Sequence, residues 1–406
     1  MRHFYSDMPE IKKKHILIVA GEASGDLHGA NLVRAMTTLD QGIIIRGIGG
    51  KRLEEAGVDI LAPSSDLAVV GLTEVLSKLP KIIRAHHNMR SLLKDSRPEL
   101  LILIDFPDFN ISLARTARRL KVPVLYYISP QLWAWRSGRV KKIADRVDKM
   151  AVILPFEKEF YLKTGANIDV EYVGHPIMDA LPDNIDARMN SDALGLGKGR
   201  PVIGILPGSR TEEIKNLLPS MIGAAEILSS RYRDMQCVLL LAPTIPFEFI
   251  QPFIRETSVK IAVSQKDIYN TLSVCDLALV ASGTATLETA VMGVPMVIAY
   301  RVSPVSYKIG KRFIKVPFVR LVNLIAGQEI VPEILQDEVT PHALADKASL
   351  ILDDEGVRKT MIMNLRKVRE SLGGRGASER TAKIAMELIE INSYQGGLNV
   401  KKHPDC

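Results

Sequence analysis

The sequence lacks several features that would assign it to a class at once. Its 406 residues include three cysteines, Cys237, Cys275 and Cys406, with no CxxC spacing. This excludes a disulfide scaffold and a cysteine-based zinc site, and it is typical of a reducing compartment. No apolar run approaches the roughly 18 residues of a membrane-spanning helix, and residues 1–14 contain no apolar signal-peptide core. We therefore expect a protein that is soluble, or that lies on a membrane without crossing it.

Widespread phosphate, cofactor and metal motifs are also missing. The sequence has no GxxxxGK[ST] loop, no GxGxxG fingerprint and no HxxxH or HExxH pair. A nicotinamide dehydrogenase is therefore disfavoured, and we expect neither a metal nor another cofactor. The net charge of +7, from 53 basic and 46 acidic residues, is a mild excess. Because no nucleic-acid-binding module accompanies it, we predict no nucleic-acid partner.

What the sequence does contain is a regular alternation of short apolar runs and helical patterns. Runs such as LLILI at 100–104 have the length of buried strands. The alternation predicts an α/β fold with two Rossmann-like, doubly wound domains, because it breaks once and then restarts. The break is rich in Gly, Pro, Asn and Asp. The predicted parts are loose tails at 1–14 and 393–406, domains at 15–178 and 201–376, a connection at 179–200 and a last helix at 377–392.

Three strand–glycine–helix junctions place backbone N–H groups where they can bind phosphate. They are GEASGD (21–26), PGSR (207–210) and SGTAT (282–286). A glycine after a strand is about as often a plain turn residue, so one loop alone decides nothing. The second half has two such loops. One carries Arg210, which can pair with a pyrophosphate, and the other precedes Glu288, which can accept hydrogen bonds from a ribose. Together they favour a nucleotide site in the second half.

Asp105 follows five apolar residues, so we expect it at the carboxyl end of a buried strand. Open α/β sheets bind their ligands at that edge. A desolvated carboxylate there can deprotonate an attacking hydroxyl. A turn-forming or capping aspartate is the commoner role beside a proline such as Pro107. The residues alone leave that alternative open, and they also leave open whether Asp108 shares a proton with Asp105.

Both tryptophans of the chain lie in SPQLWAWRSGR at 129–139, with Arg136 and Arg139 beside them. Aromatic rings next to arginines suit the stacking of a sugar or the binding of a phosphorylated ligand. Two core anchors are the commoner reading of Trp133 and Trp135.

An apolar stripe with basic neighbours occupies residues 67–83. Pro80 is expected to interrupt it by opening a second short helix. The stripe is either buried against a sheet or exposed for docking to an anionic membrane surface. A second basic run, at 301–320, contains six cations and no acid. The members of the stripe, at helical spacings, are Val69, Leu72, Leu76, Leu79 and Ile83.

Taken together in their order, nine segments resemble the lipid-A-disaccharide synthase family. The resemblance spans about residues 15–340. The segments are GEASGD (21–26), LAVVGLTEVL (67–76), IDFPDFN (104–110), SPQLWAWR (129–136), LPFEKEFY (154–161), VGHP (173–176), LPGSR (206–210), ASGTATLE (281–288) and NLIAGQEIVPEILQ (323–336).

The resemblance implies a GT-B glycosyltransferase, in which two Rossmann-like domains face each other across a cleft. The implied partners are UDP-2,3-diacylglucosamine as donor and 2,3-diacylglucosamine 1-phosphate as acceptor. The implied products are a β-1,6-linked disaccharide 1-phosphate of lipid A synthesis and UDP. A cytoplasmic protein peripherally associated with the inner face of the inner membrane is also implied. That location favours the exposed, membrane-docking reading of Val69, Leu72, Leu76 and Leu79.

The resemblance also implies roles for single residues. Asp105 matches the essential aspartate and is expected to act as general base on the acceptor 6-hydroxyl, with inversion at the anomeric carbon. Arg210 is expected to offset charge on the leaving UDP. No metal is implied, because helix dipoles and Arg210 can act on the leaving group. The other expected donor contacts are Gly208, Ser209, Ser282, Gly283, Thr284, Glu288 and Asn323, and the expected acceptor-side residues are Glu22, Ser24 and Arg136.

Two alternative functions stay open. One is another GT-B enzyme that acts on UDP-N-acetylglucosamine, against which the IDFPDFN and SPQLWAWR segments argue. The other is a non-catalytic protein that binds a nucleotide sugar or a lipid, against which Asp105 and Arg210 argue. The oligomeric state stays unknown.

Overall fold

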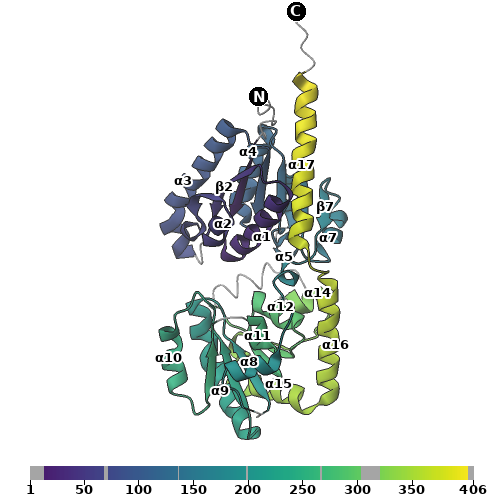
Figure 1. Ribbon diagram of the computed structural model, residues 1–406. Coiled ribbons are helices and arrows are strands. Elements are labelled where there is room, and N and C mark those ends of the chain that lie inside the picture. The colour runs from purple at the N-terminus through teal and green to yellow at the C-terminus, as the bar shows by residue number, and fades with distance from the viewer. Residues whose placement is uncertain are drawn as a thin grey trace, which may run out of the picture. The chain divides into compact units, whose positions relative to one another are not determined.

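The computed structural model describes residues 13–67, 72–135, 137–197, 200–265, 268–302 and 321–400, and of these the backbone alone at 23, 72–77, 134, 135, 137 and 393–400. The chain divides into two units (Figure 1). Unit 1 is Met1–Asp179 together with Gly374–Cys406, and unit 2 is Ala180–Gly373. Each unit is a parallel sheet with helices on both faces, which is the predicted α/β architecture.

The sheet of unit 1 has seven strands in the order β3-β2-β1-β4-β5-β6-β7. The central strand β4 is buried at every residue, because helices cover both of its faces. The register pairs Ala20 of β1 with Ile104 of β4, so these two strands end side by side. The strands are β1 (Lys14–Ala20), β2 (Ile43–Gly49), β3 (Asp59–Pro63), β4 (Leu100–Ile104), β5 (Val124–Tyr127), β6 (Lys149–Val152) and β7 (Asp169–Tyr172).

The helices of unit 1 divide between the two faces of this sheet. Because β1–β2–β3 and β4–β5–β6–β7 run outward in opposite directions, right-handed crossovers put their helices on opposite faces. Helix α17 packs along α1 in Figure 1, whereas α3, α4, α6 and α7 share the other core. The helices are α1 (Ala23–Leu39), α2 (Lys51–Glu55), α3 (Leu72–Ser96), α4 (Pro107–Arg119), α5 (Leu132–Trp135), α6 (Val140–Ala144), α7 (Glu157–Lys163) and α17 (Ala377–Val400), with 3-10 turns η1 (Ser64–Asp66), η2 (Ser137–Arg139) and η3 (Pro176–Met178).

The prediction that Pro80 opens a second helix is wrong. Helix α3 runs through Pro80 without a break and ends at Ser96. Proline removes one backbone hydrogen bond from a helix interior, but contacts on either side hold this helix in place. Lys78 Nζ donates to the Ser65 carbonyl at 3.0 Å, and Lys81 Nζ lies 2.8 Å from an Asp66 carboxylate oxygen. These contacts join α3 to the η1 turn on either side of Pro80.

The chain ends differ from the prediction in one respect. Helix α17 continues to Val400, so residues 393–400 are helical and not a loose tail. The predicted connection at 179–200 contains helix α8 (Ala187–Ala193) and belongs to unit 2 from Ala180 onward. Asp179 stands at this boundary and caps α17, since its carboxylate accepts hydrogen bonds from the N–H groups of Gly376 and Ser378 at 2.7 and 3.2 Å.

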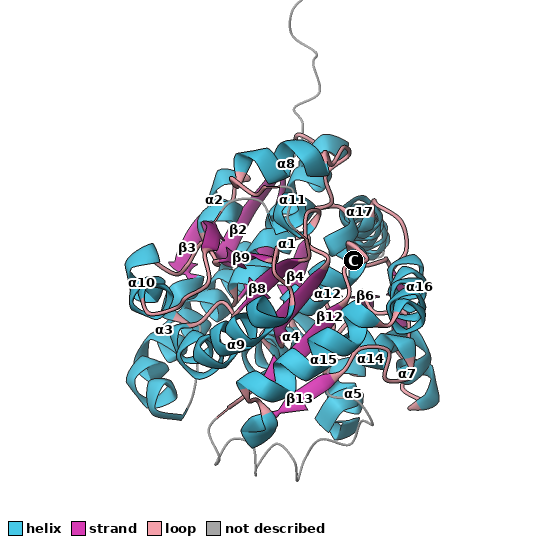
Figure 2. Ribbon diagram, turned by 90° about the horizontal axis from the view of Figure 1, so that it is seen from below, coloured by secondary structure: helices cyan, strands magenta, loops and turns pink. Residues whose placement is uncertain are grey.

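Unit 2 repeats the architecture with six parallel strands in the order β10-β9-β8-β11-β12-β13. Helices α9 and α15 pack together, and α12 packs against α16 (Figure 2). The strands are β8 (Val202–Leu206), β9 (Gln236–Leu240), β10 (Ile261–Ser264), β11 (Leu277–Ala281), β12 (Met296–Tyr300) and β13 (Glu333–Leu335), and beside α8 the helices are α9 (Thr211–Arg231), α10 (Phe247–Arg255), α11 (Ile268–Leu272), α12 (Thr284–Val291), α14 (Leu321–Ala326), α15 (Pro341–Asp353) and α16 (Glu355–Ser371), with the 3-10 turn η4 (Gln336–Glu338).

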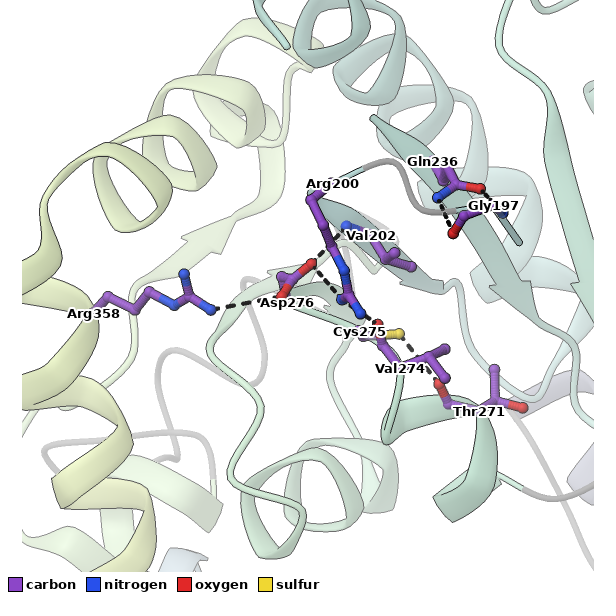
Figure 3. Close-up of polar contacts among 9 residues, drawn as sticks. All are labelled: Gly197, Arg200, Val202, Gln236, Thr271, Val274, Cys275, Asp276 and Arg358. Carbon is purple, nitrogen blue, oxygen red and sulfur yellow. Dashed lines mark hydrogen bonds and ion pairs between the residues drawn. The ribbon is translucent and has the colours of Figure 1, made fainter. Parts of the chain in front are cut away.

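Carboxylates fasten the amino ends of the strands. Asp276, just before β11, donates its N–H to the Val202 carbonyl of β8 at 2.8 Å and accepts the Val202 N–H at 2.8 Å (Figure 3). Arg200 Nη1 donates to the same carboxylate at 2.8 Å, and Arg358 lies 3.6 Å from its other oxygen. This carboxylate is therefore paired with both backbone and cations.

Unit 1 uses the same device at the amino edge of its own sheet. Asp148, just before β6, donates its N–H to the Val124 carbonyl at 3.0 Å and accepts the Val124 N–H at 2.8 Å. Arg118 Nη1 donates to its other oxygen at 3.0 Å. Glu99, just before β4, accepts the His15 N–H at 2.7 Å. Carboxylates at this edge join neighbouring strands.

Within the described ranges, no helix is both long enough and apolar enough to span a bilayer.

Candidate active site

The candidate loops gather at the carboxyl ends of the two central strand pairs. In unit 1 the GEASGD loop follows β1 and Asp105 follows its neighbour β4. In unit 2 PGSR follows β8, and SGTAT follows its neighbour β11. At both places the strand order reverses direction, and this switch point is where open α/β sheets bind ligands. The fold therefore brings each unit's predicted loops to its own switch point.

Asp105 stands in a strained turn at the end of β4. Its φ is +47° and that of Phe106 is +45°, two successive non-glycine residues in the left-handed region. Residues held in such sparsely populated regions cost of order 1–3 kcal/mol each and need support from their surroundings. Ile128, just past the neighbouring strand β5, has a φ of +63°. The carboxyl ends of β4 and β5 thus carry three residues in the left-handed region, and Arg97 and Lys121 adopt it at the other edge of the sheet.

Three residues support this turn, and the sequence analysis gave none of them that role. The Asp105 carbonyl accepts a hydrogen bond from Asn110 Nδ2 at 2.6 Å and another from the Tyr126 hydroxyl. Gly21 lets the Phe106 ring approach, since a Cβ at residue 21 would lie 2.4 Å from the Phe106 Cγ. Asn110 could have been noticed in the sequence, because asparagine is unfavourable in a helix interior and its presence there suggests a specific contact. Tyr126 lies within an apolar strand, and nothing in the sequence marks it as a supporting residue.

The Asp105 carboxyl has the acidity that a general base needs. Burial, together with the nearby charge of Glu22, raises its pKa to about 6, although the hydrogen bond from the Phe106 N–H acts in the opposite direction. A base with a pKa near the working pH combines the ionised form with useful basicity. Glu22 and Ser24, the predicted acceptor-side residues, lie exposed at the start of α1. Arg136, the third of that group, lies outside the described residues.

Asp108 makes a contact of a different kind. It lies on the first turn of α4, its side chain is 73% exposed, and Arg139 Nη1 donates to it at 2.5 Å. The exposed ion pair with Arg139 favours the structural reading of Asp108 over a proton shared with Asp105.

Glu157 joins the SPQLWAWR and LPFEKEFY segments. It is 1% exposed, and its carboxylate accepts the Trp133 Nε1–H at 3.2 Å and the Leu154 N–H at 3.0 Å. Burial raises its pKa to about 7, against the effect of these bonds. The Trp133 ring packs edge-on against Phe156, with centroids 5.2 Å apart. Trp133 is therefore an anchored ring, and the side chain of Trp135 lies outside the description.

In unit 2 the PGSR loop holds an internal carboxylate. Gly208 has a φ of +117°, and a Cβ there would lie 2.6 Å from Glu213 Oε2. Glu213 accepts the Ser209 N–H at 3.0 Å and lies 3.7 Å from Arg210 Nη1. The Arg210 side chain is 55% exposed. Glu213 thus lies where the helix N-terminus and Arg210 would attract a phosphate, and the sequence analysis missed it.

The SGTAT loop leaves its groups accessible. Gly283 and Thr284 are exposed and Ser282 is half-buried. A Cβ at Gly283 would meet no atom within 4 Å, so the space above the start of α12 is open. Glu288 lies on the second turn of α12, and burial raises its pKa to about 7. Among the described residues no cation pairs with it.

Asn323 was predicted to contact the donor nucleotide, but its side chain is bonded within the protein. It is fully buried in α14, and its Oδ1 accepts the N–H groups of Ile330 and Val331 at 2.8 and 3.1 Å. Its Nδ2 donates to the Val331 carbonyl at 2.9 Å and to Glu333 Oε1 at 2.8 Å. All four hydrogen-bonding positions of the amide are filled. Asn323 therefore holds the 330–333 segment and offers nothing to a ligand directly.

The apolar stripe is described in part. Leu79 is 42% exposed and Ile83 60% exposed. Residues 83 and 85 are roughly 200° apart around a helix, so Ile83 lies away from the buried face that starts at Ala85 and continues with Met89, whereas Leu79 lies at the edge of that face. Val69 and the side chains of Leu72 and Leu76 lie outside the description, as does most of the basic run at 301–320.

Two histidines of unit 1 have pKa values well below the usual range. Burial lowers the pKa of His28 to about 4 and that of His175 to about 3, so both are neutral near pH 7. His175 Nδ1 accepts the Ile177 N–H at 3.1 Å. No cluster of three or more metal-ligating side chains occurs among the residues that the structure describes.

Solved structures of similar fold place this arrangement in a class. The calicheamicin glycosyltransferase CalG4 matches with a TM-score of 0.60 and 14% identity over 93% of this chain and 99% of that chain. The UDP-GlcNAc 2-epimerase from Neisseria meningitidis, bound to UDP-GlcNAc, matches with a TM-score of 0.59 and 12% identity over 92% of this chain and all (100%) of that chain. The fold is that of the GT-B glycosyltransferases and related epimerases, as predicted.

Sequence comparison defines the family. The model of the lipid-A-disaccharide synthetase family matches residues 16–388. The lipid-A-disaccharide synthase of Geobacter sulfurreducens is 46% identical over 382 residues, which cover 94% of this chain and 99% of that protein. The enzyme of the same name from Myxococcus xanthus is 41% identical over 374 residues, 92% of this chain and 97% of that protein. The chain belongs to the lipid-A-disaccharide synthase family of glycosyltransferases, which confirms the resemblance.

Proposed function

We propose that the protein is an inverting glycosyltransferase that joins UDP-2,3-diacylglucosamine to 2,3-diacylglucosamine 1-phosphate. The products are the β-1,6-linked disaccharide 1-phosphate of lipid A synthesis and UDP. Family membership supports the reaction. The single observation that supports the chemistry is Asp105, a carboxylate at the switch point of unit 1 with its pKa raised to about 6 and no paired cation among the described residues.

In the proposed step Asp105 acts as general base. Its carboxylate accepts the proton of the acceptor 6-hydroxyl while that oxygen attacks the anomeric carbon of the donor. The bond from the anomeric carbon to the β-phosphate oxygen breaks, and its electron pair leaves with UDP. Positioned base catalysis of this kind contributes roughly 10²- to 10⁴-fold. The strained backbone at 105–106, held by Asn110 and Tyr126, fixes the carboxylate toward the acceptor.

Unit 2 supplies the donor contacts in this proposal. The N–H groups of Gly208, Ser209 and the SGTAT residues Ser282, Gly283 and Thr284 bind the pyrophosphate, and Arg210 offsets its charge. Glu288 accepts hydrogen bonds from the ribose hydroxyls, which explains a buried carboxylate without a cation. When the pyrophosphate binds, Glu213 gives up the Ser209 N–H. The helix N-termini and Arg210 then stabilise the leaving group with protein groups alone.

The lipid substrates require contact with a membrane, and α3 suits it. Leu79 and Ile83 are exposed on α3, and basic residues flank them. We propose that this face docks to the anionic cytoplasmic surface of the inner membrane. Leu79→Glu with Ile83→Glu should reduce co-sedimentation with phosphatidylglycerol vesicles several-fold and leave turnover in detergent unchanged. Unchanged co-sedimentation would show that α3 does not dock.

Turnover in detergent tests the proposal. Purified protein with both diacylated substrates should release UDP and form the disaccharide, and Asp105→Asn should form almost none. The fold is shared with a UDP-GlcNAc 2-epimerase, so unacylated UDP-N-acetylglucosamine is the comparison substrate. Epimerisation or transfer of that sugar in preference to the diacylated donor would replace the proposal with the rival GT-B activity.

A further inference from the structure

A cationic cavity lies between α4 and α6 of unit 1. It has a volume of about 210 Å³ and is lined by Asp108, Ile111, Ser112, Arg115, Arg139, Lys142 and Arg146. Four of these side chains are cations and one is an acid. Ligand pockets for drug-sized molecules are usually about 300–1,000 Å³, so this cavity fits a small group and not a nucleotide.

One ion pair and one hydrogen bond join its walls, and its cations are only partly neutralised. Arg139 pairs with Asp108, and Arg146 Nη1 donates to the Ile111 carbonyl at 3.0 Å, which ties the end of the α6 region to α4. In the described chain no acid pairs with Arg115, Lys142 or Arg146. Four cations against one carboxylate leave a local charge of about +3 at the cavity. Such a concentration of positive charge attracts an anion.

The lining also matches one ligand chemistry. Arginine forks, a lysine and the Ser112 hydroxyl all donate hydrogen bonds, so the cavity presents donors on several sides. A phosphate monoester carries about −1.5 to −2 charges and three acceptor oxygens, which fits both the charge and the size. A carboxylate would leave most of the donors without a partner.

The position of the cavity points to the source of that phosphate. Asp108, one of its lining residues, lies on the first turn of α4, three residues after Asp105. We propose that this cavity binds the phosphate monoester of the acceptor sugar while Asp105 faces its 6-hydroxyl. The inference rests on the proposed function for the identity of the acceptor. It assigns Arg115 and Lys142 to recognition of the acceptor. The competing source of a phosphate group for this cavity is the anionic headgroup of a membrane lipid.

The experiment compares two charge-matched double variants. Arg115→Gln with Lys142→Gln removes two cations that line the cavity. Arg119→Gln with Lys141→Gln removes two exposed cations from the same helices, outside it. Each protein is assayed in detergent with 2,3-diacylglucosamine 1-phosphate and with the same sugar lacking the phosphate. The cavity variant should raise KM for the phosphorylated acceptor about 10-fold or more, lose the preference for it, and keep KM for the donor. The control should behave as wild type.

Binding assays separate this inference from the proposed function. Glucosamine 1-phosphate, titrated calorimetrically, should bind the wild type and the control and bind the cavity variant about 10-fold more weakly. That result without any turnover would support the cavity and refute the proposed reaction. Turnover in which the cavity variant retains the full preference for phosphorylated acceptor would overturn the inference. If that variant also loses co-sedimentation with phosphatidylglycerol vesicles, the cavity binds lipid headgroups instead of the acceptor.

Discussion

The two edges of each sheet treat carboxylates in opposite ways. At the amino edge Asp148 and Asp276 each bind a neighbouring strand through its N–H group, and each faces an arginine. At the carboxyl edge Asp105 and Glu288 face no cation among the described residues, and burial raises the pKa of both. The same residue types thus fasten strands at one edge and stay available for ligands at the other.

The physical difference lies in what compensates each charge. A carboxylate at the amino edge exchanges water for backbone donors and a guanidinium, so its burial is compensated by charge-assisted bonds. One at the carboxyl edge loses water without such partners, which destabilises its ionised form. In the proposed reaction, that cost is offset when a substrate proton reaches Asp105 and a ribose hydroxyl reaches Glu288. Carboxylates that the fold leaves uncompensated are therefore the candidates for function.

The largest effect expected from this comparison is on turnover. Asp105→Asn removes the base and should lower kcat roughly 10²- to 10⁴-fold. Asp148→Asn, the matched change at the amino edge of the same sheet, should leave kcat of the folded protein within about twofold. Steady-state rates with both diacylated substrates measure this. Equal losses in the two variants would break the distinction between the edges.

The next effect is on the stability of unit 2. Asp276→Ala removes the acceptor of the Val202 N–H and the partner of Arg200, and it should lower the free energy of unfolding of unit 2 by about 1–3 kcal/mol. Hydrogen exchange of the β8 and β11 amides reports this locally. UDP affinity of the folded protein should stay unchanged, because Asp276 lies at the far edge of the sheet from PGSR. A weaker UDP complex with unchanged exchange would contradict this assignment.

A smaller effect is expected at Glu288. Glu288→Gln keeps the shape but weakens the acceptors offered to a ribose, so UDP should bind about 10-fold more weakly in calorimetric titration. Because burial raises the Glu288 pKa to about 7, the wild-type carboxyl loses stabilisation as pH rises through 7. The variant should therefore be at least as stable as the wild type at pH 8. A destabilised variant with full UDP affinity would show that Glu288 stabilises the fold, as Asp148 and Asp276 do, and does not bind the ribose.

The smallest effect concerns Glu157, which combines the raised pKa of the carboxylates at the carboxyl edge with the hydrogen bonds of those at the amino edge. Its pKa is raised to about 7 by burial, yet it accepts hydrogen bonds from Trp133 and from backbone N–H groups. Trp133→Phe removes one donor and keeps the aromatic contact, so unit 1 should lose about 1 kcal/mol. Acceptor KM should rise only a few-fold. A large fall in kcat would show that Glu157 acts in the reaction itself.

Much of the fold and part of the site could be predicted from the sequence. Apolar runs of strand length followed by glycine loops predict both sheets, and the topology then brings those loops to the switch points. The path of α3 through Pro80 could not be predicted, because proline usually ends or opens a helix and the sequence gives no sign of the contacts that Lys78 and Lys81 make beside it. The filled hydrogen bonds of Asn323 and the position of Glu213 at the PGSR loop depend on three-dimensional packing, which spacing along the chain does not encode.

The most direct test of the central claim is the free energy of unfolding of unit 1 in two Asp→Asn variants. Both tryptophans of the chain lie in unit 1, so their fluorescence in urea reports this unit alone. The Asp105 pKa is about 6 when folded and near 3.8 as a free group, so its ionisation lowers stability as pH rises from about 4 through 6. Asp105→Asn should match the wild type near pH 4 and exceed it by about 1–3 kcal/mol at pH 8. Asp148→Asn should be less stable than the wild type at pH 8. No gain from Asp105→Asn at pH 8, or a gain from Asp148→Asn, would contradict the account.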